Sequence, residues 1–290
     1  MDGILLVDKP RGMTSHDVVF KVRKALSEPR IGHTGTLDPM ASGLLVLCLG
    51  RATKLVRYLT EHDKVYEATF LVGIATDTDD VTGKTIAAQP VGTLDPATVD
   101  TVLESFVGAS EQMPPAYAAI KVDGRKLYDY ARKGEAMPDI EKRPIMIEGL
   151  VRTSDVTIAD GTASFTVRAQ VSKGTYIRAL ARDFGGRLGI PTTLAALRRT
   201  RVGRFDLLGA VALDAITTDE CALIDPLAAL AFPRIVLDQE HEFKARNGAF
   251  LPVSLFPGTT ETIVCGGSRD PLAIYEYDAE RGVMRLAVLL

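Results

Sequence analysis

The segment of residues 32–43, with the sequence GHTGTLDPMASG, constrains the fold more than any other part of the chain. It places a single carboxylate, Asp38, among three glycines, a proline and several small or hydroxylated residues. Glycine permits backbone conformations and close approaches that side chains forbid, and Pro39 biases Asp38 toward an extended conformation. The apolar run of residues 44–49 follows, and its length and bounding glycines predict a fully buried strand. We therefore expect a rigid loop that presents Asp38.

A second interpretation of this segment is a plain turn. Asp-Pro pairs and glycine-rich loops are ordinary turn chemistry, and composition alone favours that interpretation. Two features favour a functional loop: special-backbone residues lie on both sides of Asp38, and we find no comparably constrained acidic residue elsewhere in the sequence. A catalytic Asp38 would require a partner.

Composition narrows the classes of protein to consider. The chain has 290 residues, of which 46% are hydrophobic and 24% charged, which suits a globular protein with a large core and more than one domain. The three cysteines and four histidines are scattered without metal-ligand or disulfide spacing, so we expect neither a metal site nor a disulfide framework. No apolar run is long enough to span a bilayer, and the first residues lack a basic region and a cleavage site. We expect a soluble, cytoplasmic protein.

Positive charge is concentrated in two places although the formal net charge is −3. Between residues 178 and 204, seven arginines accompany one acidic residue, Asp183, and a second basic cluster lies within residues 9–30. Such clusters are usually solvated faces. Arginine favours phosphate because its planar fork binds oxyanions with two hydrogen bonds, so the arginine-rich segment favours an RNA-binding role.

Hydrophobic periodicity predicts a mixture of helices and strands. A capping pattern at Thr14 and Asp17 predicts a helix that runs to about Ser27. We predict further helices over residues 51–60, 95–107, 123–134, 175–188 and 219–230. We predict strands over residues 3–7, 43–49, 65–73, 145–154, 162–171 and 204–209.

Two segments differ from the rest in composition. Residues 110–144 contain four prolines and many charges without a sustained strand pattern, so we predict an insertion that reaches out from the core and holds a ligand. After a boundary at residues 226–233, short β-prone runs alternate with glycine-rich turns and predict a small all-β module over residues 234–290, with strands at 234–237, 250–253, 262–265, 273–277 and 285–289. Such a module can bind a ligand or simply cap the core of the main domain.

Five ordered motifs resemble those of the TruB-type tRNA pseudouridine synthases. They are DKPRGMTS at residues 8–15, the glycine-rich loop at 32–43, KVYEA at 64–68, MPPAY at 113–117 continuing to Lys121, and KGTYIR at 173–178 followed by LRRT at 197–200. The C-terminal module is similar to a PUA domain. The resemblance implies an α+β fold with a central mixed, mainly antiparallel sheet in a catalytic domain over residues 1–230, with a thumb-like insertion, and an RNA-binding PUA-like domain over residues 234–290.

The resemblance also implies roles for individual residues. Asp38 would be the nucleophile, Arg178 would pair with it, and Tyr66 would stack on the flipped uracil and help to remove its C5 proton. Without the resemblance, we would interpret Arg178 as a phosphate-binding or surface arginine and Tyr66 as a residue that packs within a strand. The further substrate-binding residues implied are His33, Tyr176, Leu197, Lys9, Arg198 and Arg199. For Tyr176 and Leu197 the alternative is core packing, and a lone histidine such as His33 is usually structural.

The expected activity is the isomerisation of uridine to pseudouridine at position 55 in the T arm of tRNA. The enzyme would act on a flipped-out uridine without a cofactor, a metal or a guide RNA, as a monomer, and would grip the T arm and the acceptor end of tRNA. Sequence leaves open whether Asp38 attacks C1′ of the ribose or removes a C2′ proton to form a glycal. Two alternatives remain: a guide-RNA-dependent relative, and a non-catalytic tRNA-binding or chaperone protein.

Overall fold

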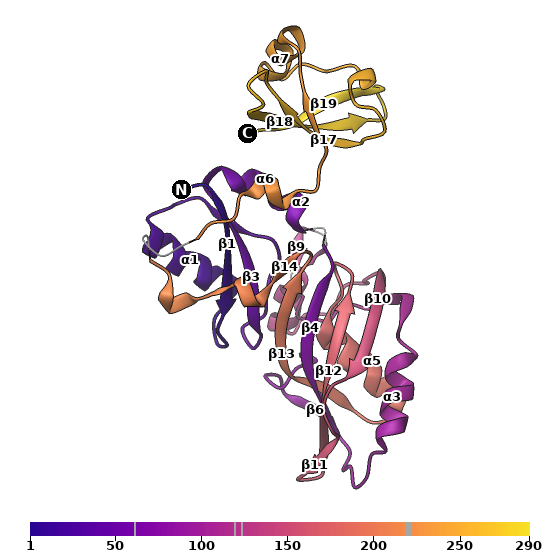
Figure 1. Cartoon of the computed structure of the whole chain (residues 1–290). Coiled ribbons are helices and arrows are strands. Elements are labelled where there is room, and N and C mark those ends of the chain that lie inside the picture. The colour runs from indigo at the N-terminus through magenta and orange to yellow at the C-terminus, as the bar shows by residue number, and fades with distance from the viewer. Residues whose placement is uncertain (61, 119, 123, 218–221) are drawn as a thin grey trace.

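Two β-sheets organise the chain in the computed structural model, a large one in the N-terminal part and a small one at the C-terminal end (Figure 1). The structure describes residues 1–60, 62–118, 120–122, 124–217 and 222–290. Within these ranges no helix has both the length and the apolar character needed to cross a membrane.

The large sheet has eleven strands in the described residues, with the order β15-β1-β3-β13-β4-β12-β10-β7 and with β2, β14 and β11 paired to β3, β13 and β12. Only the pairs β1 with β15 and β3 with β13 are parallel, which confirms the predicted mixed, mainly antiparallel sheet. Its strands are β1 (Gly3–Lys9), β2 (Ile31–His33), β3 (Ser42–Leu49), β4 (Lys64–Val72), β7 (Gly108–Gln112), β10 (Arg143–Arg152), β11 (Thr157–Ala159), β12 (Thr162–Val171), β13 (Thr192–Val202), β14 (Phe205–Asp206) and β15 (Val211–Ala212).

Helices pack on the large sheet where its side chains are apolar. Helix α1 (Ser15–Leu26) begins at a capping box between Thr14 and Asp17 and buries Val18 and Val22 against β1 and β3. Helices α3 (Pro96–Glu104) and α5 (Ile177–Leu188) pack on the β4, β12 and β10 part of the sheet, as the lower half of Figure 1 shows. Phe184 of α5 completes an aromatic cluster with two phenylalanines of β4 and β12.

The small sheet is formed by β16 (Arg234–Val236), β17 (Glu261–Cys265), β18 (Pro271–Asp278) and β19 (Val283–Leu289), with α7 (Gln239–Arg246) between the first two. This C-terminal unit is consistent with the predicted PUA-like module. It packs against the N-terminal part through an apolar cluster shared with β1, β3 and α6 (Pro226–Ala229). Helix α2 (Val56–Thr60), which follows a 3₁₀ turn at Gly50–Leu55, contacts it through Tyr58.

Most predicted elements are confirmed, and the differences have physical reasons. The predicted strand at 204–209 is wrong beyond the short β14, because Leu207–Gly209 forms a 3₁₀ turn. The predicted helix at 219–230 starts outside the described residues; from 222 onward only α6 is helical, since Pro226 occupies the first turn. The predicted strand at 250–253 is a single bridge at Leu251 followed by a 3₁₀ turn.

The insertion at 110–144 is more structured than predicted. Its first residues continue β7 on the sheet edge, and a two-stranded hairpin, β8 (Lys121–Val122) with β9 (Arg125–Lys126), leads into α4 (Leu127–Lys133). The predicted helix over 123–134 therefore begins later, and residue 123 lies outside the described residues. A second hairpin, β5 (Ile74–Thr76) with β6 (Thr85–Ala88), follows β4 and brings residues 77–83 toward α5.

Candidate active site

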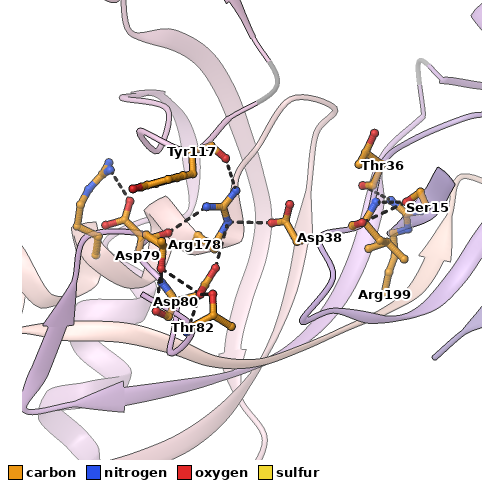
Figure 2. Close-up of polar contacts among 12 residues, drawn as sticks. Ser15, Thr36, Asp38, Asp79, Asp80, Thr82, Tyr117, Arg178 and Arg199 are labelled. Carbon is orange, nitrogen blue, oxygen red and sulfur yellow. Dashed lines mark hydrogen bonds and ion pairs between the residues drawn. The ribbon is translucent and has the colours of Figure 1, made fainter. Parts of the chain in front are cut away.

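The loop that carries Asp38 joins β2 to β3 and is fixed from the side of α1. The Ser15 hydroxyl accepts a hydrogen bond from the Leu37 amide at 2.8 Å and lies 3.1 Å from the Leu37 carbonyl, to which it donates (Figure 2). The Gly12 amide donates to the Pro39 carbonyl at 2.7 Å. Because both neighbours of Asp38 are held in this way, the carboxylate is presented from a fixed backbone.

Arg199 fixes the same loop from the sheet. It lies on β13, is 1% exposed, and its guanidinium donates to the carbonyls of Leu44 at 2.8 Å and Gly35 at 3.1 Å. Gly43 allows the backbone of Arg199 to approach the start of β3 closely. The φ of this glycine is +100°, and a Cβ there would lie 2.3 Å from the Arg199 carbonyl oxygen. The arginine predicted to bind substrate is therefore used to hold the loop, and it also lines the cavity beside it.

Arg178 is the partner of Asp38. Its Nε lies 2.8 Å from Asp38 Oδ2, and its Nη1 and Nη2 each donate at 3.0 Å to the carbonyls of Thr78 and Tyr117 (Figure 2). The arginine lies in the first turn of α5 and its side chain is 6% exposed, whereas that of Asp38 is 39% exposed. A buried guanidinium with a polar partner at each of its three nitrogens thus orients a carboxylate that remains accessible to a substrate.

A second carboxylate, Asp80, faces Arg178 and was missed by the sequence analysis. Its Oδ2 lies 3.9 Å from Arg178 Nε, and its side chain is 7% exposed. Asp80 Oδ1 accepts the Thr82 amide at 2.8 Å and the hydroxyls of Thr82 and Thr78. The expectation that no acidic residue other than Asp38 is comparably constrained is therefore wrong. The available signal was the alternation of aspartate and threonine before Gly83, which is typical of side chains that bond their own turn.

The neighbouring Asp79 holds the same turn on α5 through Arg182, whose Nη1 lies 2.9 Å from Asp79 Oδ2. Burial raises the pKa of Asp79 against the opposing effect of Arg182 and Arg178. The residues 77–83 are consequently attached to α5 at two arginines one helical turn apart.

Asp38 and Arg178 lie at a cavity of about 310 Å³. Tyr66 on β4 and Leu197 on β13 form its sheet wall, with 7% and 6% of their surface exposed. Tyr176, directly before α5, lines it from the other side, and its backbone is held by reciprocal hydrogen bonds with the Gln112 amide. Burial raises the pKa of Tyr176. The cavity offers flat apolar surface next to one accessible carboxylate, as a site for a planar base requires.

Three of the predicted substrate-binding residues do not line this cavity. Lys9 is fully buried, its ammonium donates to the carbonyls of Met13 at 2.6 Å and Pro10 at 3.0 Å, and burial lowers its pKa to about 8. Arg198 pairs with Asp8 at 2.7 Å. The Nδ1 atom of His33 is buried without a hydrogen-bond partner in the described residues, and burial lowers the pKa of this histidine.

Most arginines of the arginine-rich segment form hydrogen bonds or ion pairs with other groups of the protein. Six of its seven arginines bond carbonyls, hydroxyls or carboxylates of the chain: Arg178, Arg182, Arg187, Arg198, Arg199 and Arg204. Arginine excess in sequence is thus a weaker indicator of a phosphate-binding surface than expected. No group of three or more histidine, cysteine or acidic residues within the described ranges is arranged to hold a metal.

Comparison with known proteins agrees with this geometry. Residues 23–177 match the family described as TruB family pseudouridylate synthase, N-terminal domain. The chain belongs to the TruB family. Two relatives are named tRNA pseudouridine synthase B: the Bacillus subtilis protein is 40% identical, with 100% of this chain and 98% of that protein covered, and the Bacillus cytotoxicus protein is 41% identical, with 97% and 94% covered. The TruB-family chain described here is thus an enzyme of the pseudouridine synthase class.

Solved structures share the fold at lower identity. A Cbf5-Nop10-Gar1 complex matches at 23% identity and a TM-score of 0.67, covering 94% of this chain and 78% of that chain. An H/ACA ribonucleoprotein bound to a substrate RNA containing 2'-deoxyuridine matches at 22% identity and a TM-score of 0.66, covering 99% and 83%. These matches establish the pseudouridine synthase fold for this TruB-family chain, in agreement with the sequence-based expectation.

Proposed function

We propose that the protein converts uridine to pseudouridine at position 55 in the T arm of tRNA, with Asp38 acting on a flipped-out nucleotide and without a guide RNA. The observation that carries this proposal is the pairing of an accessible carboxylate with a buried guanidinium at 2.8 Å, at the mouth of a cavity with aromatic and aliphatic walls. The names of the full-length relatives support tRNA as the substrate.

The reaction breaks the bond between uracil N1 and ribose C1′, turns the base and joins C5 to the same carbon. The ribose carbon must be held during the turn, and a carboxylate does so either by bonding C1′ or by removing a C2′ proton to form a glycal. Arg178 orients Asp38 for either route. Tyr66 stacks against the base and, once C5 is attached, is placed to help remove its proton. None of these steps needs a metal or a redox cofactor.

Base flipping must be driven by contacts outside the cavity. Extruding a base costs on the order of a few kcal/mol. We assign this work to the hairpin and helix of the insertion, β8 to α4, and to a PUA-like domain over residues 234–290 that grips the acceptor end while residues 1–230 carry the chemistry. Phe250 supports the second assignment, because it is 51% exposed and lies under the Arg281 guanidinium at 5.2 Å. We further infer a cytoplasmic monomer.

One assay distinguishes this proposal from the two alternatives, a guide-RNA-dependent enzyme and a non-catalytic tRNA-binding protein. Purified protein is incubated with an isolated T-arm stem-loop and with full-length tRNA, and pseudouridine is measured at each uridine. We expect conversion of the uridine at position 55 alone, in both RNAs, without added RNA or cofactor. Conversion that requires a guide RNA would support the guide-dependent alternative, and tRNA binding without any conversion would support the non-catalytic one.

A further inference from the structure

Two buried cations share one wall of the cavity. Lys64 and Tyr66 lie on the same face of β4, and Arg199 is the cross-strand neighbour of Tyr66 on β13. Lys64 is 8% exposed and Arg199 is 1% exposed, and both line the cavity. They flank Gly35: a Cβ at that glycine would lie 3.4 Å from Arg199 Nη1 and 3.6 Å from Lys64 Cε. The end of the cavity under the Asp38 loop is therefore strongly positive.

Asp63 acts on Lys64 only at a distance, against the effect of Arg199. Within the described residues neither Lys64 nor Arg199 lies in an ion pair with a carboxylate, whereas Arg178 faces two carboxylates. The Lys64 ammonium donates to the carbonyls of His62 at 2.7 Å and Thr60 at 3.4 Å. Burying an ammonium group beside a second cation is unfavourable, and burial together with Arg199 lowers the pKa of Lys64 to about 8.

Helix capping explains only part of this arrangement. Thr60 is the last residue of α2, and a lysine that donates to the final carbonyls of a helix is a common C-terminal cap. An exposed lysine would cap the helix without the cost of desolvation. The position of Lys64 on the cavity wall, beside the residue that stacks on the base, indicates that its charge also serves the substrate.

We propose that Lys64, with Arg199 beside it, binds an anionic oxygen of the flipped uridine nucleotide. This inference rests on the proposed function. Two groups of the substrate carry such an oxygen. One is the phosphodiester next to the flipped nucleotide. The other is uracil itself after the N1–C1′ bond breaks, because the electron pair of that bond stays on uracil and is shared by N1, O2 and O4.

The test compares Lys64→Met, which removes the charge, with Lys64→Arg, which keeps it, and with Lys84→Met, which removes an exposed lysine outside the cavity. Each protein is measured for tRNA affinity at several salt concentrations, for the single-turnover rate at saturating enzyme, and for thermal unfolding. We expect Lys64→Met to lose at least tenfold in either affinity or rate, Lys64→Arg to recover part of the loss, and Lys84→Met to match the wild type.

The two sources of the oxygen give different patterns. A phosphate contact predicts weaker tRNA binding, a smaller salt dependence and an unchanged saturating rate. A uracil contact predicts unchanged binding, a lower saturating rate and a smaller loss in the rate of N1–C1′ bond cleavage on 5-fluorouridine RNA, whose base is a better leaving group. Cleavage is the readout for that RNA because fluorine replaces the C5 proton that must leave to form pseudouridine. The inference is overturned if Lys64→Met behaves as Lys84→Met does, or if Lys64→Arg is as impaired as Lys64→Met. Failure of the wild type to form pseudouridine would instead contradict the proposed function.

Discussion

At the scale of single residues, the site depends on which groups contact the guanidinium of Arg178. Arg178 bonds two backbone carbonyls and faces two carboxylates, of which Asp38 is accessible and Asp80 is buried. Asp80 is buried beside Arg178 Nε, and Thr82 fixes its position. We therefore interpret Asp80 as a positioning residue that acts on Asp38 through Arg178.

Replacing Asp80 by asparagine tests this interpretation. Asparagine keeps an oxygen for the Thr82 amide and removes the negative charge that faces Arg178, so the turn is retained while the orientation of Arg178 is weakened. We expect Asp80→Asn to lower the single-turnover rate about tenfold or more, equivalent to at least about 1.4 kcal/mol, with little change in tRNA affinity. Asp183→Asn is the matched control, because Asp183 pairs with Arg182 and not with Arg178. Equal rates for the two variants would exclude the positioning role.

How much of the site the sequence could reveal depended on the type of residue. Asp38 is conspicuous because special-backbone residues surround it, and the family resemblance suggested Arg178 as its partner. The aspartate and threonine alternation around Asp80 indicates a turn but not its partner, because the contact with Arg178 joins residues 98 positions apart and exists only once the turn between β5 and β6 lies against α5. Lys9 looks like a surface lysine in sequence, and only the fold shows that it is buried.

At the scale of elements, the parallel contact between β3 and β13 positions the Asp38 loop. Their register places Gly43 opposite Arg199, at the point where the loop enters the buried strand. Because a Cβ at Gly43 would lie 2.3 Å from the Arg199 carbonyl oxygen, the close approach of the two strands requires glycine.

We expect Gly43→Ala to destabilise the protein by roughly 2 kcal/mol or more, because it combines a positive φ with a backbone clash. It should also lower activity by displacing the loop that presents Asp38. Thermal or denaturant unfolding and the tRNA assay measure the two effects. Gly149→Ala is the control, since a Cβ at Gly149 meets no atom within 4 Å in the described structure. A Gly43→Ala protein with wild-type stability would contradict this account of the loop.

Two elements, β13 and α7, were not predicted from the sequence because their residue patterns are irregular. The apolar run of β3 and the alternating pattern of β12 identify strands directly, and both are confirmed. Strand β13 lacks such a pattern because its buried face includes Arg199 and its ladder with β4 contains two bulges. Helix α7 is highly charged and buries only Ala245, so no apolar stripe marks it in the sequence.

At the scale of the whole molecule, the C-terminal sheet is attached to the wall of the active site. Glu276 on β18 accepts hydrogen bonds from Arg57 and from the Tyr58 hydroxyl on α2 at 2.7 Å, and Phe232 packs edge-on against Tyr58. Helix α2 ends at Thr60, which lines the cavity. A tRNA that contacts both the cavity and the C-terminal unit requires these two parts to keep a fixed orientation.

Glu276→Ala should therefore weaken the binding of full-length tRNA several-fold while leaving the conversion of an isolated T-arm stem-loop nearly unchanged. The physical reason is that only the larger RNA spans both parts of the protein. Glu240→Ala provides the control, because in the described part of the chain the ion pair of Glu240 is with Lys244, inside α7 itself. An equal loss on both RNAs would mean that Glu276 supports the cavity itself and not the orientation of the C-terminal unit.

The central claim is that Asp38 performs the chemistry, and Asp38→Asn tests it most directly. Asparagine has nearly the same shape and keeps an oxygen for the contact with Arg178, but it has no negative charge with which to hold the ribose carbon. We predict that the variant binds tRNA with wild-type affinity and forms no detectable pseudouridine in single-turnover conditions. Pseudouridine formation at the wild-type rate by Asp38→Asn would contradict the account.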